Sequence, residues 1–420
     1  NTTASNNTAV GYQSLYANTT GDSLTAVGYQ ALKASTGVNN TAVGYNAFTA
    51  TTTGVHNAGL GRAAGLSNTT GSYNTAIGDA ALPFNTTASN NTAVGYQSLY
   101  TNTTGESNVA IGLKAMYSNT TASNNIAVGY QALELNTTGG ANAALGLQAL
   151  ENNTTGANNI ALGFRALQSN TTASNNTAVG YQAGYTNTTG SENTAVGHKA
   201  GYSNTTGRFN AFVGRDAGHS SNASDNSFFG EYSGRSTTGG SNTFLGQQAG
   251  VHVTTGAKNT IIGRYNGNQG GLDIRTSSNN IVLSDGDGNP RQWINSSGLV
   301  LIGTDIGSAQ LNVDATGDRA TISARVNANG DSCFQPLNAS GTAVGNIIAN
   351  ASSTAYNTSS DYRLKENVDY TWDATTRLKQ LKPARFNFIA DADTTVDGFL
   401  AHEAQAVVPE CVTGAKDAVD

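Results

Sequence analysis

Ser360 and Lys365 are the two residues of this chain whose types and spacing best suit covalent chemistry. A serine hydroxyl is a weak nucleophile that needs a nearby base. A lysine can be that base once burial lowers its pKa, because desolvation disfavours the ammonium form. The pair also has an ordinary explanation, because Ser-Ser-Asp is frequent in turns and helix N-caps and a lysine is often a solvated charge.

The pair lies at a change in composition. Charged residues make up 11% of the 420-residue chain, against roughly 25% in ordinary soluble domains. They are sparse before Ser360 and frequent after it. We therefore predict a domain boundary there, with residues 360–420 as a separate small α+β domain.

The composition also excludes some functions. The net charge of −6 argues against a nucleic-acid partner. No apolar run is long enough to insert into a membrane, and no signal peptide is visible. Cys333 and Cys411 lie far apart, and we interpret them as unpaired thiols. The chain begins without Met in the middle of a repeat, so we expect it to be a fragment, and we expect no cofactor.

A repeat dominates the first two thirds of the chain. It is clearest as "NTAVGYQ", and its Gly recurs every 17 or 16 residues. A fixed period of this length indicates a solenoid with one copy per rung. The sixteen copies place their Gly at Gly11, Gly28, Gly44, Gly61, Gly78, Gly95, Gly112, Gly129, Gly146, Gly163, Gly180, Gly197, Gly214, Gly230, Gly246 and Gly263.

The columns of this alignment predict the rung. "NTAVG" reads as a short strand whose Val-type residue, just before the Gly, points into the coil. The Asn four residues before the Gly is expected to stack through its side-chain amide on the rungs above and below. "TTG" and "TTASN" read as turns in which Gly takes a positive φ. The one-residue deletions fall in these turns, because a slip within a paired strand would flip its side chains.

Two further columns compensate each other in size. Two residues before the Gly, Ala or Gly gives way to Phe212, Phe228 and Phe244, while four residues after it Leu gives way to Gly. Close packing requires such compensation within one interior. We therefore predict that both columns line one shared core.

A rung of this size is thin, so three chains could bury their small-residue faces against one another. The repeats resemble the head repeats of trimeric autotransporter adhesins, and copies such as residues 85–99 resemble repeats of viral fibre proteins. The predicted fold is all-β: a trimeric β-solenoid or β-roll of 16–17-residue rungs over residues 1–267. A β neck and a small α+β domain follow it.

Between the repeat and the neck lies a connector, residues 268–304, in which Asp285, Asp287 and Asn289 separate two apolar runs as in a hairpin. Their spacing resembles the start of a calcium loop, but Ser296 stands where the loop requires Glu. We predict a plain turn and no metal. Residues 305–359 are predicted to form an intertwined β neck.

The last 60 residues resemble the endosialidase-type intramolecular chaperone of phage tail fibres and tail spikes. Three ordered blocks carry the resemblance: "SSDYRLKENV", "LKPARFNF" and "GFLAHEAQAVVPE". The family assembles three chains and then removes itself with a Ser–Lys dyad, which implies Ser360 as nucleophile and Lys365 as base. We predict a cut between Ser359 and Ser360, with the bond between Ser360 and Asp361 as the alternative.

Other residues of these blocks have no such role. Arg363, Glu366 and Asn367 match the family without an assigned function, and we interpret His402 as a packing or surface residue. The family usually continues into a long C-terminal helix, whereas this chain stops at Asp420, so we expect a truncated chaperone.

The predicted function is a viral tail or surface fibre, located in the virion and trimeric, that binds a host-cell surface receptor, with a glycan as one candidate. Its only expected enzymatic activity is a single self-cleavage. The alternative is a cell-surface adhesin or extracellular filament. An ice-binding solenoid is a further alternative, disfavoured because adjacent Thr residues in a strand point to opposite faces. No carboxylate pair recurs in any column, as a glycosidase would need.

Overall fold

In a computed structural model, the described residues are 3–298, 300–302, 331–334, 345–349, 354–358, 371–388 and 391–409. The chain divides into two compact units, Asn1–Asn312 and Val313–Asp420. Each unit is described by itself below.

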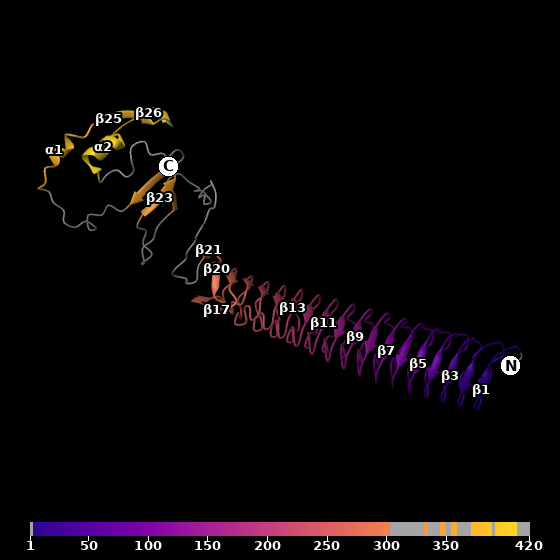
Figure 1. Ribbon diagram of the computed structural model, residues 1–420. Helices are drawn as coiled ribbons and strands as arrows, with labels where there is room; N and C mark the ends of the chain where they lie inside the picture. Colours follow the sequence, from indigo (N-terminus) through magenta and orange to yellow (C-terminus); the bar gives the residue numbers. More distant parts are fainter. Residues whose placement is uncertain are drawn as a thin grey trace. The chain divides into compact units, whose positions relative to one another are not determined.

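The first unit is a solenoid of sixteen rungs, each carrying one three-residue strand (Figure 1). Consecutive strands pair in parallel and in register, so that Thr25, for example, lies beside Thr41. This confirms the all-β solenoid with rungs of about 17 residues. The strands are β1 (Thr8–Val10), β2 (Thr25–Val27), β3 (Thr41–Val43), β4 (Ala58–Leu60), β5 (Thr75–Ile77), β6 (Thr92–Val94), β7 (Val109–Ile111), β8 (Ile126–Val128), β9 (Ala143–Leu145), β10 (Ile160–Leu162), β11 (Thr177–Val179), β12 (Thr194–Val196), β13 (Ala211–Val213), β14 (Ser227–Phe229), β15 (Thr243–Leu245) and β16 (Thr260–Ile262).

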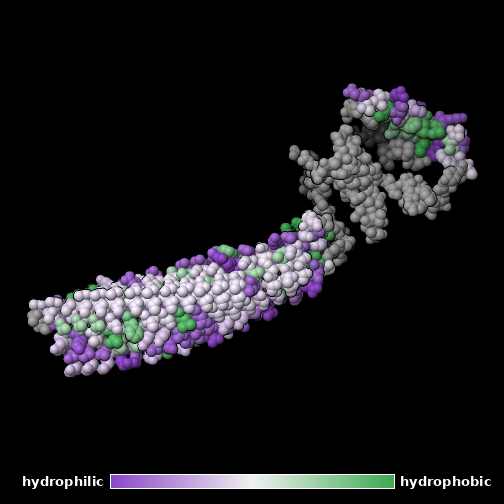
Figure 2. Space-filling view, turned by 180° about the vertical axis from the view of Figure 1, so that it is seen from behind, coloured by the Kyte–Doolittle hydropathy of each residue, from purple (hydrophilic) through white to green (hydrophobic). Residues whose placement is uncertain are grey.

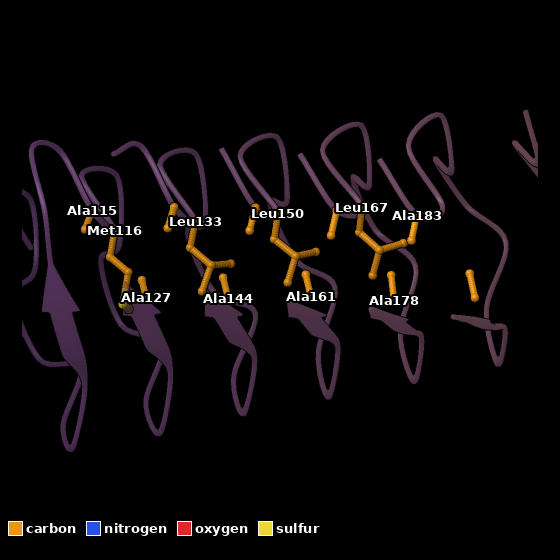
Figure 3. Close-up of a cluster of buried hydrophobic side chains, with 14 of the residues drawn as sticks. Ala115, Met116, Ala127, Leu133, Ala144, Leu150, Ala161, Leu167, Ala178 and Ala183 are labelled. Carbon is orange, nitrogen blue, oxygen red and sulfur yellow. The ribbon is translucent and has the colours of Figure 1, made fainter. Parts of the chain in front are cut away.

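The interior of each rung is built from the middle residue of the strand and from the residue four positions after the Gly. Leu150 and Ala161 of the next rung, for example, have no exposed surface and point toward each other from opposite sides of the coil (Figure 3). The predicted shared core is confirmed. The prediction that the Val-type residue points inward is wrong: Val10 is 57% exposed and Leu145 50%. Neighbouring residues of a strand face opposite ways, so an inward Ala forces the next residue outward.

The interior changes its layout as the compensating columns predict. Phe212, Phe228 and Phe244 stack with ring centroids 5.5 and 4.9 Å apart. A Cβ on Gly218 would lie 2.4 Å from the ring of Phe212, which leaves no room for the Leu of earlier rungs. Most rungs therefore hold one large side chain, supplied by one column or by the other, while the rungs of Gly65, Gly184 and Gly201 have only Ala or Gly in both.

Glycine is required at the repeat Gly for two reasons. In the first fifteen copies its φ is 128–142°, and a Cβ at Gly129 would lie 2.4 Å from the carbonyl oxygen of Gly146. The Gly of the "TTG" turns, by contrast, was predicted to have a positive φ, and this is wrong. Gly105 has no such φ, and Ala88 and Ala122 occupy the same place in neighbouring rungs.

Two columns of buried Asn hold the rungs together. In the predicted column, the side-chain oxygen of Asn40 accepts the backbone N–H of Asn57 at 2.8 Å, so the stack forms mainly through the backbone. A second column, seven residues after the Gly, forms a direct amide ladder, in which Asn85 Nδ2 donates to Asn68 Oδ1 at 2.8 Å. The ladder continues in the same way through Asn102, Asn119, Asn136, Asn153, Asn170 and Asn187.

The three 16-residue steps lack one residue in the turn, as predicted, and the flanking strands stay in register. Each of these rungs replaces the ladder Asn by a smaller hydroxyl residue, namely Ser35, Ser221 or Thr237, all fully buried. Thr51 and Val253 fill the same place in rungs of full length, so the exchange is not confined to the short turns.

A small cap follows the sixteen rungs. β17 (Asn268–Gln269) and β18 (Leu272–Asp273) form a short antiparallel pair. β19 (Ile281–Ser284) continues the parallel stack beside β16, and β20 (Pro290–Ile294) and β21 (Val300–Ile302) turn back antiparallel. The predicted hairpin is therefore present, and Trp293 Nε1 donates to Asn280 Oδ1 at 3.0 Å, which closes the Asn column.

The second unit contains small sheets and short helices. β22 (Asp331–Phe334), β23 (Gly345–Ala349) and β24 (Thr354–Thr358) form an antiparallel sheet. β25 (Ala384–Phe388) and β26 (Asp391–Gly398) form a hairpin between two helices. These are α1 (Ala374–Leu378) and α2 (Ala401–Val407), where the sequence predicts short helices.

Candidate functional sites: the C-terminal unit and the solenoid surface

The predicted dyad lies outside the described residues. Ser359, Ser360, Asp361 and Lys365 fall between β24, which ends at Thr358, and Thr371, where the description resumes. The same holds for Arg363, Glu366 and Asn367. The pairing of Ser360 with Lys365 therefore stays a prediction, and the described geometry concerns the rest of the unit.

Helix α1 begins at an N-cap formed by Asp373, whose Oδ1 accepts the backbone N–H of Thr376 at 3.1 Å. Hydrogen bonds from the side chain and backbone of Thr376 hold the pKa of Asp373 below its ordinary value. Pro383 lies beyond the helix, consistent with its predicted role as the stop.

The two helices are linked by Arg377. Its Nε donates to the backbone oxygen of Val407 at 2.7 Å, and its guanidinium lies 5.7 Å from the ring centroid of Trp372. Lys382 and Glu403 add an ion pair of 3.7 Å. One charged side chain of α1 thus caps a backbone oxygen at the end of α2 and covers an aromatic ring.

The hairpin β25–β26 is braced on its surface. Arg385 donates to the carboxylate of Asp397 at 2.6 and 3.1 Å, and these bonds hold the pKa of Asp397 below its ordinary value. Because the pair is exposed, it adds little stability and chiefly fixes the register of the two strands.

The helices border an apolar hollow of about 390 Å³. Trp372, Leu378, Leu381 and Val408 line it, together with Thr375 and Arg377. Leu378 is 66% exposed and Trp372 51%, and Figure 2 shows hydrophobic surface gathered on the visible side of this unit. His402 is exposed on α2, as expected of a surface residue.

Apolar side chains also form a continuous surface on the solenoid. It consists of the outward-facing first and third residues of strands β1–β16, which we call the strand stripe. Not one of these 32 positions is charged. Its most exposed large members are Val10, Leu60, Ile77, Ile111, Ile126, Leu145, Ile160, Leu162, Phe229, Leu245 and Ile262. The third positions are apolar in all sixteen strands, whereas ten of the first positions are Thr or Ser. Exposed apolar residues in a continuous row are typical of interaction surfaces.

The turn that resembled a calcium loop is held by its own residues. Asp285 accepts the backbone N–H groups of Asp287 and Asn289 and pairs with Arg291. Among the residues that the structure describes, no group of three or more His, Cys, Asp or Glu side chains is placed to hold a metal ion. No helix within the described ranges is long and apolar enough to cross a membrane.

The chain thus combines a β-solenoid with a C-terminal unit of small sheets and short helices, which defines it as a repeat protein with an appended small domain. Residues 360–413 match the family model described as chaperone of endosialidase. The chain thus carries a C-terminal endosialidase-chaperone domain after a long β-solenoid. Comparisons with curated proteins and with solved structures gave no match.

Neither the amide ladder nor the strand stripe was predicted from the sequence. A signal for the ladder exists, because the "NTTG" Asn becomes Ser or Thr in every 16-residue copy. The stripe follows from the alternation of side chains along a strand. Once the middle residue of each strand is assigned to the interior, the first and third residues must face outward.

Proposed function

We propose that this protein is a viral tail or surface fibre that attaches the virion to its host and assembles as a parallel homotrimer. The observation that carries the proposal is the match to an endosialidase chaperone over residues 360–413, at the end of a chain that is otherwise largely a repeat rod. A long rod can hold a receptor-binding surface far from the point where the fibre is attached. A chaperone at the C-terminal end of the sequence can align identical chains during assembly.

The strand stripe supports the trimer and changes its geometry. The small residues of the Ala column are buried inside each chain's own coil, so they are not free to form the contact expected between small-residue faces of three chains. The uncharged, exposed strand stripe takes its place as the contact between copies. Exposed Trp372 and Leu378 give the C-terminal unit a second apolar surface for the same purpose.

The proposed cleavage uses Ser360 and Lys365. The Ser360 hydroxyl attacks the carbonyl carbon of Ser359 while neutral Lys365 accepts the hydroxyl proton. The Ser360 nitrogen leaves with that proton, and water then hydrolyses the resulting ester to a carboxylate. Attack on an adjacent carbonyl is intramolecular, which is worth up to roughly 7–11 kcal/mol when the geometry is right. Because the lysine must be neutral, folding must bury it first.

The test is expression of the full chain as wild type, Ser360→Ala and Lys365→Ala, followed by a denaturing gel and mass measurement of the fragments. We expect the wild type to lose its C-terminal piece and both variants to stay whole. Ser359→Ala is the matched control: it removes a neighbouring hydroxyl and should still be cut. Equal cleavage in all chains, or a cut far from residue 360, contradicts the dyad.

A further inference from the structure

Two columns of aromatic side chains run along the outside of the solenoid, one and five residues after the repeat Gly. Between the tenth and thirteenth rungs each column forms a three-ring stack that ends in a histidine, with centroids 5.0–5.2 Å apart. The stacks are Phe164–Tyr181–His198 and Tyr185–Tyr202–His219. Rings stacked in this way expose their edges and polar atoms, so the tyrosine hydroxyls are available for hydrogen bonds.

Cations lie over one ring of the second stack and over Tyr232, which stands two residues after the next repeat Gly. Lys199 Nζ is 5.5 Å from the ring centroid of Tyr202. Arg215 and Arg235 both lie over Tyr232, at 4.6 and 5.2 Å. Cation–π contacts hold long side chains in place, so these charges are fixed on the surface before a ligand arrives.

Two of these cations are not neutralised. Arg215 pairs with Glu231, which also accepts a hydrogen bond from Gln247. Lys199 and Arg235, in contrast, form no ion pair with any residue in the described ranges. Asp216 stands one rung after Lys199 in the same column and is the acid close to His219. Elsewhere in the solenoid, cations do pair across rungs, as in Arg62–Asp79, Lys114–Glu134 and Arg208–Glu192.

The chain contains its own comparison. Tyr100 and Tyr117 stack at 4.9 Å, and Lys114 lies 5.4 Å from the Tyr117 centroid. There, however, Glu134 lies 3.7 Å from Lys114 and cancels its charge. The same scaffold is thus neutral at the seventh rung, whereas between the twelfth and fourteenth the cations Lys199, Arg215 and Arg235 outnumber the acids Asp216 and Glu231 by one.

We propose that the cationic ladder, formed by Tyr185, Lys199, Tyr202, His219, Tyr232 and Arg235, binds a linear acidic polysaccharide. Its carboxylate or sulfate groups pair with Lys199 and Arg235, which lie two rungs, or about 10 Å, apart along the axis. The tyrosine hydroxyls bond the sugar hydroxyls between them. This inference rests on the proposed function, for which it names the receptor chemistry.

The test is titration of the full-length protein, by calorimetry at several salt concentrations, with three polymers. Polygalacturonate supplies carboxylates, dextran sulfate supplies sulfates and plain dextran is neutral. We expect at least one polyanion to bind and plain dextran not to bind. Lys199→Gln combined with Arg235→Gln should weaken binding about tenfold and lower the slope of log affinity against log salt by about two. Lys114→Gln, the matched control, should change neither.

Binding of either polyanion supports the proposed ladder, and the polymer that binds shows whether the ligand's anionic groups are carboxylates or sulfates. Absence of binding to both, equal binding to plain dextran, or an equal loss in Lys114→Gln overturns it. Mass measurement on the same samples separates the two proposals. A trimer that binds no polyanion overturns the ladder alone, whereas an uncut monomer that binds one contradicts only the fibre assembly.

Discussion

Phe48 shows how single residues share the interior of this solenoid. It stands where most early rungs have Leu, and its ring extends toward the next rung, which has Gly59 and Gly65 instead of Ala and Leu. A Cβ on Gly59 would lie 2.6 Å from Phe48 Cδ2. The two rungs together hold one large side chain, so these positions are coupled in stability.

We predict that Gly59→Ala destabilises the protein by about 1–3 kcal/mol through overpacking. Phe48→Leu in the same chain should restore most of the loss, because Ala with Leu is the pairing of the neighbouring rungs. Thermal unfolding followed by circular dichroism, over the two single variants and the double variant, measures the coupling. Additive effects in this cycle would show that the two residues do not share space.

Residue-level predictions succeeded where a size change in one column was matched in another. The exchange of Leu for Gly opposite Phe212 identified the interior correctly. The inward assignment of Val10 failed because it conflicts with that same inference: Ala9 and Val10 are neighbours in a strand and cannot both face inward. Ser360 and Lys365 lie outside the repeat, so no second copy of the pair exists with which to compare it. Only the resemblance to a family points to this dyad.

Among the elements, the hairpin β19–β20 shows how a turn can be stabilised by charge. Desolvation acts to raise the pKa of Asp285, but the Asn289 backbone N–H and Arg291 outweigh it and lower the pKa from 3.8 to about 2. A carboxyl with a lowered folded-state pKa stabilises the fold above its unfolded value. That contribution is lost as the pH falls from about 3.8 toward 2.

We therefore predict that Asp285→Asn removes part of the acid sensitivity of the cap. The wild type should lose stability between about pH 4 and pH 2, and the variant should lose less over this window. The measurement is the unfolding midpoint against pH, monitored by the fluorescence of Trp293. Asp287→Asn, which removes a neighbouring carboxylate, serves as the control and should follow the wild type.

Element boundaries were predictable here because turn chemistry is local. The Asp-Gly-Asp-Gly run located the hairpin, and Pro383 with the preceding Leu residues located α1. The amide ladder was not anticipated, because a turn Asn normally bonds its own backbone. Only stacking at one-rung spacing lets Asn85 also reach Asn68.

At the scale of the whole molecule, the strand stripe sets the expected assembly. Leu145 and Leu162 are 50% and 36% exposed and lie on adjacent rungs. We predict that Leu145→Lys with Leu162→Lys shifts the protein from trimer to monomer, because burying unpaired charges costs several kcal/mol. Light scattering gives the mass directly. Thr138→Lys with Thr155→Lys, exposed on turns of the same region, should remain trimeric; a trimer in both variants would place the interface elsewhere.

The in-register hydrogen bonds between rungs point along the axis of the rod, while the covalent chain crosses each gap only once. A pull along that axis therefore loads one set of inter-rung bonds at a time. The solenoid should therefore unfold one rung at a time under tension, instead of in a single cooperative step. Each detached rung of 17 residues releases about 55 Å of chain. A fibre built in this way can lengthen under tension while its remaining rungs stay folded.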